Sequence, residues 1–434
     1  MRTPRGLWEA AAPGGWAARP IFTPAEAHLP KAYGSRFPAL LLLVVATVAV
    51  ALAPAPARAA DAELPARLAQ SLAVPHVSPA RSAAVAVDLD TGEVLFARRP
   101  ALSLAPASTE KLPVTYALLV RLGPAYRIDT SVYGEGGLEG TTWHGDLVLK
   151  GRGDPTLGAA ALRGLALQVR ALGIRRVTGG VVGDETFFDA RRAGPGWRPS
   201  FTLYSAPLSA LTVGRSRSQR PALAAAESFR RALVAAGVRV DGDARLGTAE
   251  TEEVELATVS SPPLRQLVRT VNRHSDNFTA EQLLKHLGAV EGGAGTTTAG
   301  AAVVTRTLRE AGVPLAGVRI ADGSGLSLQN RVTANALVAV LRAAWADPAL
   351  RPVVVSSLAV AGQSGTLERR LRGTAAAGRV QAKTGTTREA CTLAGYVRGR
   401  YAFAVIQNGA PVSFTWARRA QDRFVTVLAR VEQR

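Results

Sequence analysis

The sequence predicts an α/β (α+β) fold in which a β-rich lobe interrupts a main domain. Strand-like runs occur near the start of the globular chain and again near its end, with amphipathic helical segments between them. From about residue 129 to residue 262 the pattern changes to short strands punctuated by glycine, which indicates a separate lobe. A chain of 434 residues that is 47% hydrophobic can form two such domains, each with its own core. The predicted segments are an N-terminal extension with a signal peptide (1–59), a main domain (60–129 and 262–434) and an inserted domain (130–261).

The individual elements follow from local patterns. Residues 83–88 and 93–97 alternate around Asp90-Thr91-Gly92, which predicts a β-hairpin. A helix follows and continues to about Arg121; Pro113 removes a backbone donor within it, so a kinked first turn is expected. Helical spacing of apolar residues predicts the other helices, and alternating runs predict the other strands. These are helices at about 159–172, 222–236, 264–271, 279–287, 297–311, 333–344 and 414–431, and strands at about 146–149, 179–184, 379–383, 391–397 and 401–407.

The N-terminal region has the three parts of an export signal. Lys31 and Arg36 precede an apolar run from Ala39 to Ala53, and the small-x-small site Ala57-Arg58-Ala59 follows it. The run is short for a membrane span of ~20 residues, so cleavage near Ala60 is expected, with an uncleaved anchor as the alternative. The protein is therefore expected to be exported to the periplasm or the extracellular cell envelope, peripheral to the membrane.

Composition limits the classes of partner and site. The net charge is +19, and removal of residues 1–59 takes away six basic and two acidic residues and leaves +15. Such a charge suits a polyanion, and with an export signal we expect an anionic cell-wall polymer or lipid and no nucleic acid. The single cysteine, Cys391, lies in an apolar run and excludes an intramolecular disulfide. The five histidines show no metal-ligand spacing, so no metal and no Ser-His-Asp triad are expected.

The segment Pro106-Ala107-Ser108-Thr109-Glu110-Lys111 places a hydroxyl and an amine one helical turn apart. Residues three apart share a helix face, so the Lys111 amine can act as a base for the Ser108 hydroxyl. Taken alone, the pair is more typical of a helix N-cap followed by a solvated lysine. Lysine usage favours the catalytic interpretation, because only five Lys occur and the other 47 of the 52 basic residues are Arg. A position that keeps Lys needs an amine that can lose its proton, or a compact charge, and Lys383 is a second such position.

Two later motifs can supply partners for this pair. Ser275-Asp276-Asn277 lies between two predicted helices, and Lys383-Thr384-Gly385-Thr386 lies at a late strand. Each is weak by itself, since short polar residues at a helix junction are usually N-caps. The three motifs in this order, each on a fitting element, are together a strong signal.

The motifs resemble those of the penicillin-recognising acyl-serine enzymes. Within these, the chain is similar to the D-alanyl-D-alanine carboxypeptidase and endopeptidase family, the low-molecular-mass class C penicillin-binding proteins, over about residues 82–409. The resemblance implies a β-lactamase/transpeptidase-like domain with an antiparallel five-stranded sheet flanked by helices, plus the inserted lobe. The further segments that carry it are Gly-Asp-Pro-Thr-Leu at 153–157, Pro-Gly-Trp at 195–197, Ser-Ala-Pro at 205–207, Asp-Gly-Ser-Gly-Leu-Ser at 322–327 and Gly-Thr-Leu at 365–367.

The resemblance also implies a role for each motif. Ser108 would attack the penultimate D-Ala carbonyl of a peptidoglycan stem peptide, and Lys111 would accept its proton with a pKa lowered by burial and by the charge of Lys383. Ser275 would relay a proton to the leaving amine, and Asn277 would orient Lys111 and the substrate amide. Substrate contacts are implied for Lys383, Thr384, Gly385, Thr386, Asp322 and Ser324, and an oxyanion hole for the backbone amides of Ser108 and Thr386.

The implied activity is that of a serine-type D-Ala-D-Ala carboxypeptidase without a cofactor, with D,D-endopeptidase action on cross-links as a further reaction. β-Lactam antibiotics are the implied inhibitors, because they would form an acyl-enzyme that hydrolyses slowly. The segment from Lys111 to Ser275 is shorter than in many family members, which predicts a single lobe. Leu328 stands where many members carry a basic residue, with Arg331 three residues on, so a preference for an acidic terminus on the stem peptide's side chain is in question.

Two alternatives remain open from the residues alone. A serine β-lactamase or esterase of the same fold would share all three motifs, although the inserted lobe and the additional segments argue against it. A non-catalytic cell-wall-binding protein could also be exported and basic. The intact motifs argue against this second alternative.

Overall fold

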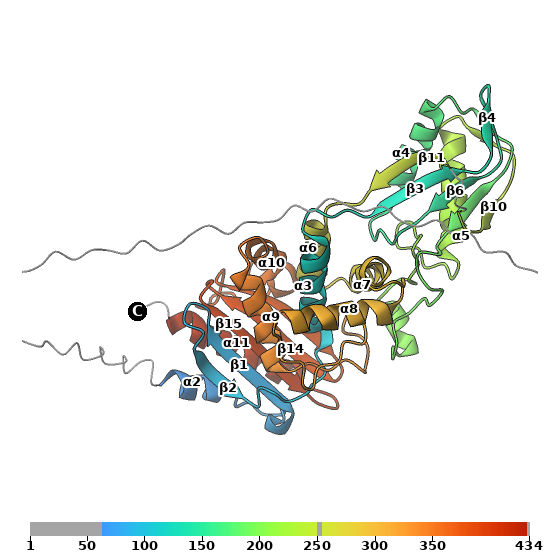
Figure 1. Cartoon of the computed structure of the whole chain (residues 1–434). Helices are drawn as coiled ribbons and strands as arrows, with labels where there is room; N and C mark the ends of the chain where they lie inside the picture. Colours follow the sequence, from blue (N-terminus) through green and yellow to red (C-terminus); the bar gives the residue numbers. More distant parts are fainter. Residues whose placement is uncertain (1–62, 250–253, 432–434) are drawn as a thin grey trace, which may run out of the picture. The chain divides into compact units, whose positions relative to one another are not determined.

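The computed structural model describes residues 63–249 and 254–431 (Figure 1). The predicted export signal, with its apolar run Ala39–Ala53 and its cleavage site, lies outside these residues. Among the described helices, none is both long and apolar enough to cross a bilayer.

An antiparallel sheet of six strands forms the centre of the main domain, in the order β12-β13-β14-β15-β1-β2. The predicted hairpin is confirmed as β1 and β2, and β1 pairs with the last strand, so that Ser82 lies opposite Gln407. The resemblance implied five strands; the sixth is β12, which is only two residues long. The strands are β1 (Ser82–Asp88), β2 (Val94–Arg98), β12 (Ala359–Val360), β13 (Val380–Thr387), β14 (Ala390–Val397) and β15 (Tyr401–Asn408).

Helices cover both faces of this sheet, because side chains alternate between the two faces along each strand. One face, which includes Val85 and Tyr396, packs against helices of the middle of the chain, and the other, which includes Ala84 and Phe403, packs against α2 and α11. The helix predicted at 414–431 is confirmed, whereas the short α2 and α10 were not predicted, since two turns give little periodic pattern. The helices are α2 (Leu64–Ser71), α3 (Lys111–Leu122), α6 (Leu264–Arg273), α7 (Asn277–Glu291), α8 (Thr297–Glu310), α9 (Ala334–Ala346), α10 (Arg351–Ser357) and α11 (Phe414–Val431).

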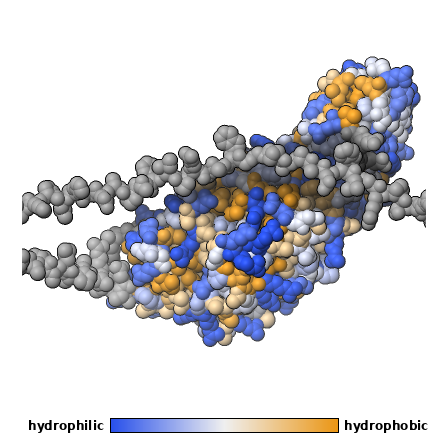
Figure 2. Space-filling model, in the orientation of Figure 1, coloured by the Kyte–Doolittle hydropathy of each residue, from blue (hydrophilic) through white to orange (hydrophobic). Residues whose placement is uncertain are grey.

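The segment between α3 and α6 has two sheets and a hydrophobic core of its own, which runs from Val132 to Ala257 and includes Phe229. Figure 2 shows a patch of hydrophobic residues on the surface of this lobe. The exposed large apolar side chains of the lobe include Leu167 and Val234. The strand orders are β10-β8-β6-β3-β11 and β4-β5-β7-β9. The elements are β3 (Asp129–Gly134), β4 (Gly137–Glu139), β5 (Thr142–His144), β6 (Leu147–Lys150), α4 (Ala159–Ala171), β7 (Arg176–Val177), β8 (Val181–Asp184), α5 (Pro221–Ala235), β9 (Arg239–Val240), β10 (Ala244–Leu246) and β11 (Val254–Ser260).

One edge of β13 is open along its second half. The short strand β12 pairs only with Gln381 and Ala382, while β13 continues to Thr387. From Lys383 onward, no strand of the described chain pairs with this edge. Its backbone groups are therefore available to an extended peptide, which can bind by adding a strand to a sheet edge.

Candidate active site

Ser108 and Lys111 come together at the start of α3. Residues Ala107–Glu110 form a 3-10 turn that leads directly into α3, so the chain is wound more tightly there than in an α-helix. Pro113, which has no backbone N–H to donate, lies in the first turn of α3. Ala107 has φ +48, a left-handed conformation that costs a non-glycine residue free energy and is common at functional sites. The Lys111 Nζ lies 3.0 Å from the Ser108 Oγ, within reach for direct proton transfer.

The Lys111 amine is buried among neutral hydrogen-bond acceptors. Besides Ser108, it contacts the Asn277 Oδ1 at 2.8 Å and the backbone carbonyl oxygen of Ser324. Its side chain has no exposed surface. Burial lowers the pKa of Lys111 to about 8, although the carboxyl groups of Asp322 and Glu281 act in the opposite direction. A substantial fraction of this amine is therefore neutral near pH 8 and can accept a proton.

The Ser275-Asp276-Asn277 segment forms the junction between α6 and α7. Ser275 has φ +58, and Asp276 caps α7 by accepting a hydrogen bond from the Thr279 backbone nitrogen at 2.7 Å. The expected N-cap therefore exists, but it is Asp276, which leaves the two flanking side chains free for the site. Asn277 bonds Lys111 through its oxygen and donates through its nitrogen to the Tyr204 carbonyl oxygen at 3.1 Å. Asn277 thus links the lysine to the inserted lobe.

Lys383 is the second buried amine of the site. Its Nζ donates to the Ser275 Oγ at 2.9 Å and to the Thr384 carbonyl oxygen at 2.7 Å. Burial and, to a smaller extent, the charge of Lys111 lower the pKa of Lys383 well below its ordinary value. Burial is the main cause of the pKa shift at both lysines, and the charge of Lys111 acts on Lys383, whereas the expected effect of Lys383 on the pKa of Lys111 is not among the causes of the Lys111 shift.

Gly385 brings β13 against the backbone of the Ser108 turn. A methyl group at this position would come within 2.9 Å of the Ser108 nitrogen and 2.8 Å of the Pro106 carbonyl oxygen. Only glycine permits this approach, which is the physical reason for glycine after Lys383 and Thr384. Thr386 follows on the exposed side of the strand, and the Thr384 hydroxyl donates to the Thr366 hydroxyl at 2.8 Å.

The loop at 322–327 forms part of the wall of the site, because the Ser324 carbonyl oxygen contacts Lys111 and residues 325–327 line the cavity beside the Ser108 turn. The Asp322 and Ser324 side chains are both fully buried, as are those of Lys111 and Lys383, and their contact with substrate stays a prediction. The Asp322 carboxylate accepts hydrogen bonds from the Gly325 nitrogen (2.8 Å), the Asn330 side chain (2.6 Å) and the Trp197 Nε1 (2.8 Å). Asp322 therefore holds the loop whose carbonyl group, at Ser324, contacts Lys111.

The sequence matches the D-Ala-D-Ala carboxypeptidase 3 (S13) family over residues 64–217 and 214–431, which is most of the chain. The chain belongs to this family. One relative of this S13 family member is a D-alanyl-D-alanine carboxypeptidase of Actinomadura sp. (strain R39). The two sequences are 34% identical in an alignment that covers 77% of this chain and 79% of the relative. A carboxypeptidase of Mycobacterium tuberculosis is 32% identical, covering 79% and 78%.

Solved structures confirm the fold class of the S13 family member. Penicillin-binding protein 4 of Haemophilus influenzae aligns with a TM-score of 0.74 at 20% sequence identity. The alignment covers 84% of this chain and 98% of the Haemophilus chain. A predatory peptidoglycan endopeptidase of Bdellovibrio bacteriovorus aligns with a TM-score of 0.53 at 18% identity, covering 75% and 86%. The chain therefore shares its overall fold with these solved structures.

Two buried carboxyl groups near Lys111, those of Glu281 and Glu110, were not predicted from the sequence. Glu281 accepts hydrogen bonds from the backbone nitrogens of Gly323 (3.0 Å) and Ser324 (2.8 Å), and burial raises its pKa to about 8. Glu110 is fully buried, its carboxyl oxygens have no hydrogen-bond partner among the described residues, and burial raises its pKa well above the ordinary value. The one signal that could have identified Glu281 is its i+4 spacing from Asn277 on α7.

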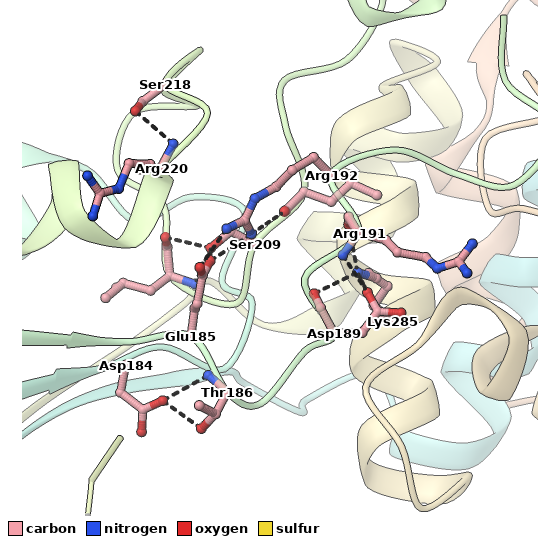
Figure 3. A network of polar contacts seen from close by, with 12 residues as sticks. Asp184, Glu185, Thr186, Asp189, Arg191, Arg192, Ser209, Ser218, Arg220 and Lys285 are labelled. Atoms are coloured by element: carbon pink, nitrogen blue, oxygen red, sulfur yellow. Dashed lines mark hydrogen bonds and ion pairs between the residues drawn. The ribbon is translucent and has the colours of Figure 1, made fainter. Parts of the chain in front are cut away.

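A third buried lysine, Lys285, lies on α7 about two helical turns after Asn277 (Figure 3). Its Nζ contacts the Asp189 carboxylate at 2.6 Å and the Arg191 carbonyl oxygen at 3.1 Å. Nearby, Arg192 pairs with Glu185 at 2.5 Å. This network ties α7, which begins at Asn277, to the 185–192 segment of the inserted lobe.

A cavity of about 390 Å³ lies next to the Ser108 turn of the S13 family member. Leu328 lines it and is partly exposed, and Arg331 also reaches it. The Arg331 Nη1 donates to the carbonyl oxygens of Leu328 (2.8 Å) and Asn330 (2.7 Å).

The single cysteine, Cys391, is buried and forms no disulfide, in agreement with its expected role as a small apolar residue.

Proposed function

We propose that this S13 family member is an exported serine-type D-Ala-D-Ala carboxypeptidase that removes the terminal D-Ala from peptidoglycan stem peptides through an acyl-serine intermediate. The observation that carries the proposal is the 3.0 Å contact between the Ser108 Oγ and the buried Lys111 Nζ. A hydroxyl beside an amine with a pKa of about 8 is an activated nucleophile. The family and its relatives supply the substrate class.

In the acylation step, the Ser108 Oγ attacks the carbonyl carbon of the penultimate D-Ala while Lys111 takes the hydroxyl proton. The tetrahedral oxyanion accepts hydrogen bonds from the backbone nitrogens of Ser108 and Thr386, and the close approach of Gly385 to the Ser108 nitrogen supports this assignment. The carbon–nitrogen bond then breaks, and the proton that Lys111 took passes through Ser275 to the departing D-Ala amine, which leaves Lys111 neutral. An ester to Ser108 remains.

In the deacylation step, water attacks the ester carbonyl and Lys111 takes the proton of the water. The bond to the Ser108 Oγ then breaks, Lys111 returns the proton to Ser108, and the shortened peptide leaves as a carboxylic acid. Asn277 keeps the Lys111 amine in place during both steps through its 2.8 Å hydrogen bond. Lys383, Thr384 and Thr386 bind the terminal carboxylate of the substrate. The open edge of β13 from Lys383 onward supports an extended substrate in this position.

We propose D,D-endopeptidase action on cross-links as a second reaction of the same site. The acyl-enzyme is identical, and the two reactions differ only in what lies beyond the scissile bond. The open edge of β13 favours it, because a longer leaving group can extend along unpaired backbone. Mass spectrometry of purified peptidoglycan fragments before and after treatment distinguishes loss of single D-Ala residues from loss of cross-linked dimers.

We propose further that the site selects weakly for an acidic terminus on the stem peptide's side chain. Leu328 offers no charge, and the Arg331 Nη1 donates to two carbonyl oxygens of its own loop, which directs the side chain along that loop. We expect similar kcat/KM values for stem peptides whose side chain ends in a carboxylate and for matched peptides that end in an amide. A preference for the carboxylate of more than tenfold would contradict this.

Labelling with fluorescent penicillin tests the acyl-serine proposal. We expect the wild-type protein to be labelled and Ser108→Ala to be unlabelled with unchanged thermal unfolding. A folded wild-type protein that stays unlabelled, and that releases no D-Ala from a stem pentapeptide, would favour the non-catalytic wall-binding alternative. Fast nitrocefin turnover without D-Ala release would favour the β-lactamase alternative.

Export is part of the proposal and has its own test. The apolar run Ala39–Ala53 and the site Ala57-Arg58-Ala59 predict a mature N-terminus at or just after Ala60. Mass spectrometry of the intact protein recovered from the envelope fraction checks this. A full-length protein in the membrane fraction would favour the uncleaved anchor.

A further inference from the structure

A groove lies between α2 and α11, on the face of the main sheet opposite to α3. The two helices lie side by side in Figure 1 and pack on the same hydrophobic cluster, which contains Leu68 and Phe424. Helix α3, which carries Lys111, belongs to the cluster on the other face. The groove has a volume of about 1010 Å³ and is separate from the candidate active site. Its lining residues are Arg67, Gln70, Ser71, Thr374, Thr415, Arg418, Arg419, Asp422, Arg423, Thr426, Val427 and Arg430.

The lining carries five arginines and a single carboxylate. That carboxylate, on Asp422, is already paired with Arg370 at 2.7 Å. Within the described chain, the guanidinium groups of Arg67, Arg423 and Arg430 have neither an ion pair nor a hydrogen bond. Most other lining residues carry hydroxyl or amide groups. The groove therefore presents unpaired positive charge together with hydrogen-bond donors.

We propose that this groove binds a linear polyanion of the cell wall whose backbone carries sugar- or polyol-phosphodiester groups. A guanidinium group matches the geometry of a phosphate with two parallel hydrogen bonds. Arg419, Arg423 and Arg430 follow one another along α11 at intervals of four and seven residues, which places charges about 6 and 10 Å apart along the helix axis. A chain with regularly spaced phosphates can contact such a row at several points.

Two other classes of polyanion fit the groove less well. A bilayer surface is flat and would meet the rims of a groove before its floor, and Val427 is the only large apolar side chain in the lining. A single-stranded nucleic acid binds proteins largely by stacking its bases on aromatic side chains, and the lining contains none. The predicted export of the chain also removes nucleic acid as a partner.

Such binding would hold the enzyme at the wall without occupying the catalytic face. The polymer contacts α2 and α11 behind the sheet, whereas the open edge of β13 and Ser108 lie with the helices of the other face. The groove therefore supplies a reason for the net charge of +15 that the catalytic site does not require. The inference does not depend on the catalytic proposal, since a protein without peptidase activity could bind in the same way.

Binding of purified poly(glycerol phosphate) to the mature protein tests the inference. We expect binding that weakens as salt rises, because exposed charges are screened. The double variant Arg419→Gln/Arg423→Gln should bind about 25-fold more weakly, at roughly fivefold for each charge near a polyanion. The matched control is Arg265→Gln/Arg269→Gln, which removes two exposed arginines at the same spacing from α6 and should bind like the wild-type protein. Penicillin labelling of both variants reports that they are folded.

Several outcomes would overturn the inference. Equal loss in the two double variants would mean that net charge alone drives binding, and no binding of the polymer by wild-type protein would remove the site. Tighter binding to phosphatidylglycerol vesicles or to a single-stranded oligonucleotide, with the same dependence on Arg419 and Arg423, would assign the groove to a different partner. Loss of polymer binding in the groove variant alone, with penicillin labelling retained, supports it.

Discussion

Fully buried lysines occur in two regions of the molecule, and the regions differ in whether a carboxylate forms an ion pair with the lysine amine. In the candidate active site, Lys111 and Lys383 are hydrogen-bonded to hydroxyl, amide and carbonyl oxygens. In the contact between α7 and the inserted lobe, Lys285 forms a 2.6 Å ion pair with Asp189. Burial lowers the pKa of all three amines, but at Lys285 the Asp189 carboxylate opposes that shift and favours the charged form, so the paired amine serves as a structural link.

This difference shows what the scarcity of lysine in the sequence means. The chain uses arginine for most positive charges, and three of its five lysines have no exposed surface. A compact ammonium fits a closed space that a guanidinium group would overfill. Lysine usage therefore identifies buried amines, and the partner of each amine determines whether its role is chemical or structural.

The largest expected effect comes from Lys111→Met, which removes the base and keeps the length of the side chain. We expect the second-order rate of penicillin acylation to fall by about 10³-fold, within the usual range for loss of a general base. Stopped-flow labelling measures it. The matched variant Lys285→Met should keep acylation at temperatures where it is folded. Equal losses in the two variants would end the distinction between chemical and structural lysines.

A smaller loss is expected from Lys383→Ala, because Ser108 and Lys111 remain in place. Acylation should fall by about 10²-fold, since a contact to the substrate carboxylate and the 2.9 Å hydrogen bond to Ser275 are both lost. The control is Lys150→Ala in the inserted lobe, where Lys150 is partly exposed and 3.4 Å from Asp184. If Lys383→Ala were as active as this control, Lys383 would not belong to the catalytic group.

The structural lysine should show the opposite profile, with an effect on stability. Lys285→Met leaves the Asp189 carboxylate without its partner, and we expect a loss of about 2 kcal/mol in the free energy of unfolding, below the value for a fully buried pair because Asp189 is partly exposed. Urea denaturation measures it. The double variant Lys285→Met/Asp189→Asn should lose less than the sum of the two single variants. Additive losses would show that the pair is not coupled.

The sequence contained enough to predict the main site but not its surroundings. Ser108, Lys111, Ser275, Asn277 and Lys383 could be found because each motif is local and its spacing has a direct geometric meaning. The Lys285 pair could not, because its partner Asp189 lies 96 residues away and nothing local couples them.

The sequence did not reveal which individual polar side chains are buried. Asp322 and Ser324 lie in a polar, glycine-rich loop, which suggested contact with the substrate and gave no sign that both side chains are buried. Glu110 stands next to Lys111 in the sequence, and only the structure shows that it is enclosed without a hydrogen-bond partner among the described residues. The fold class was more accessible, because alternation and helical spacing report which face of an element is buried. The extra strand β12 is too short to leave such a pattern.

The finest test of the comparison is the pH midpoint of acylation, which we expect to be the same in the wild-type protein and in Lys285→Met. The pKa of Lys111 is about 8, below its ordinary value, so the neutral base is scarce at pH 6 and abundant above pH 8. The second-order rate of penicillin acylation should rise by about tenfold per pH unit below pH 7.5 and level off above pH 8.5, since only the deprotonated fraction reacts. Because the pKa of Lys111 is set by its own enclosure and not by the Asp189 pair, Lys285→Met should keep the same midpoint. A midpoint that moved in this variant would mean that the α7 contact also controls the charge of the catalytic amine, and the two lysine environments would then be parts of one electrostatic unit.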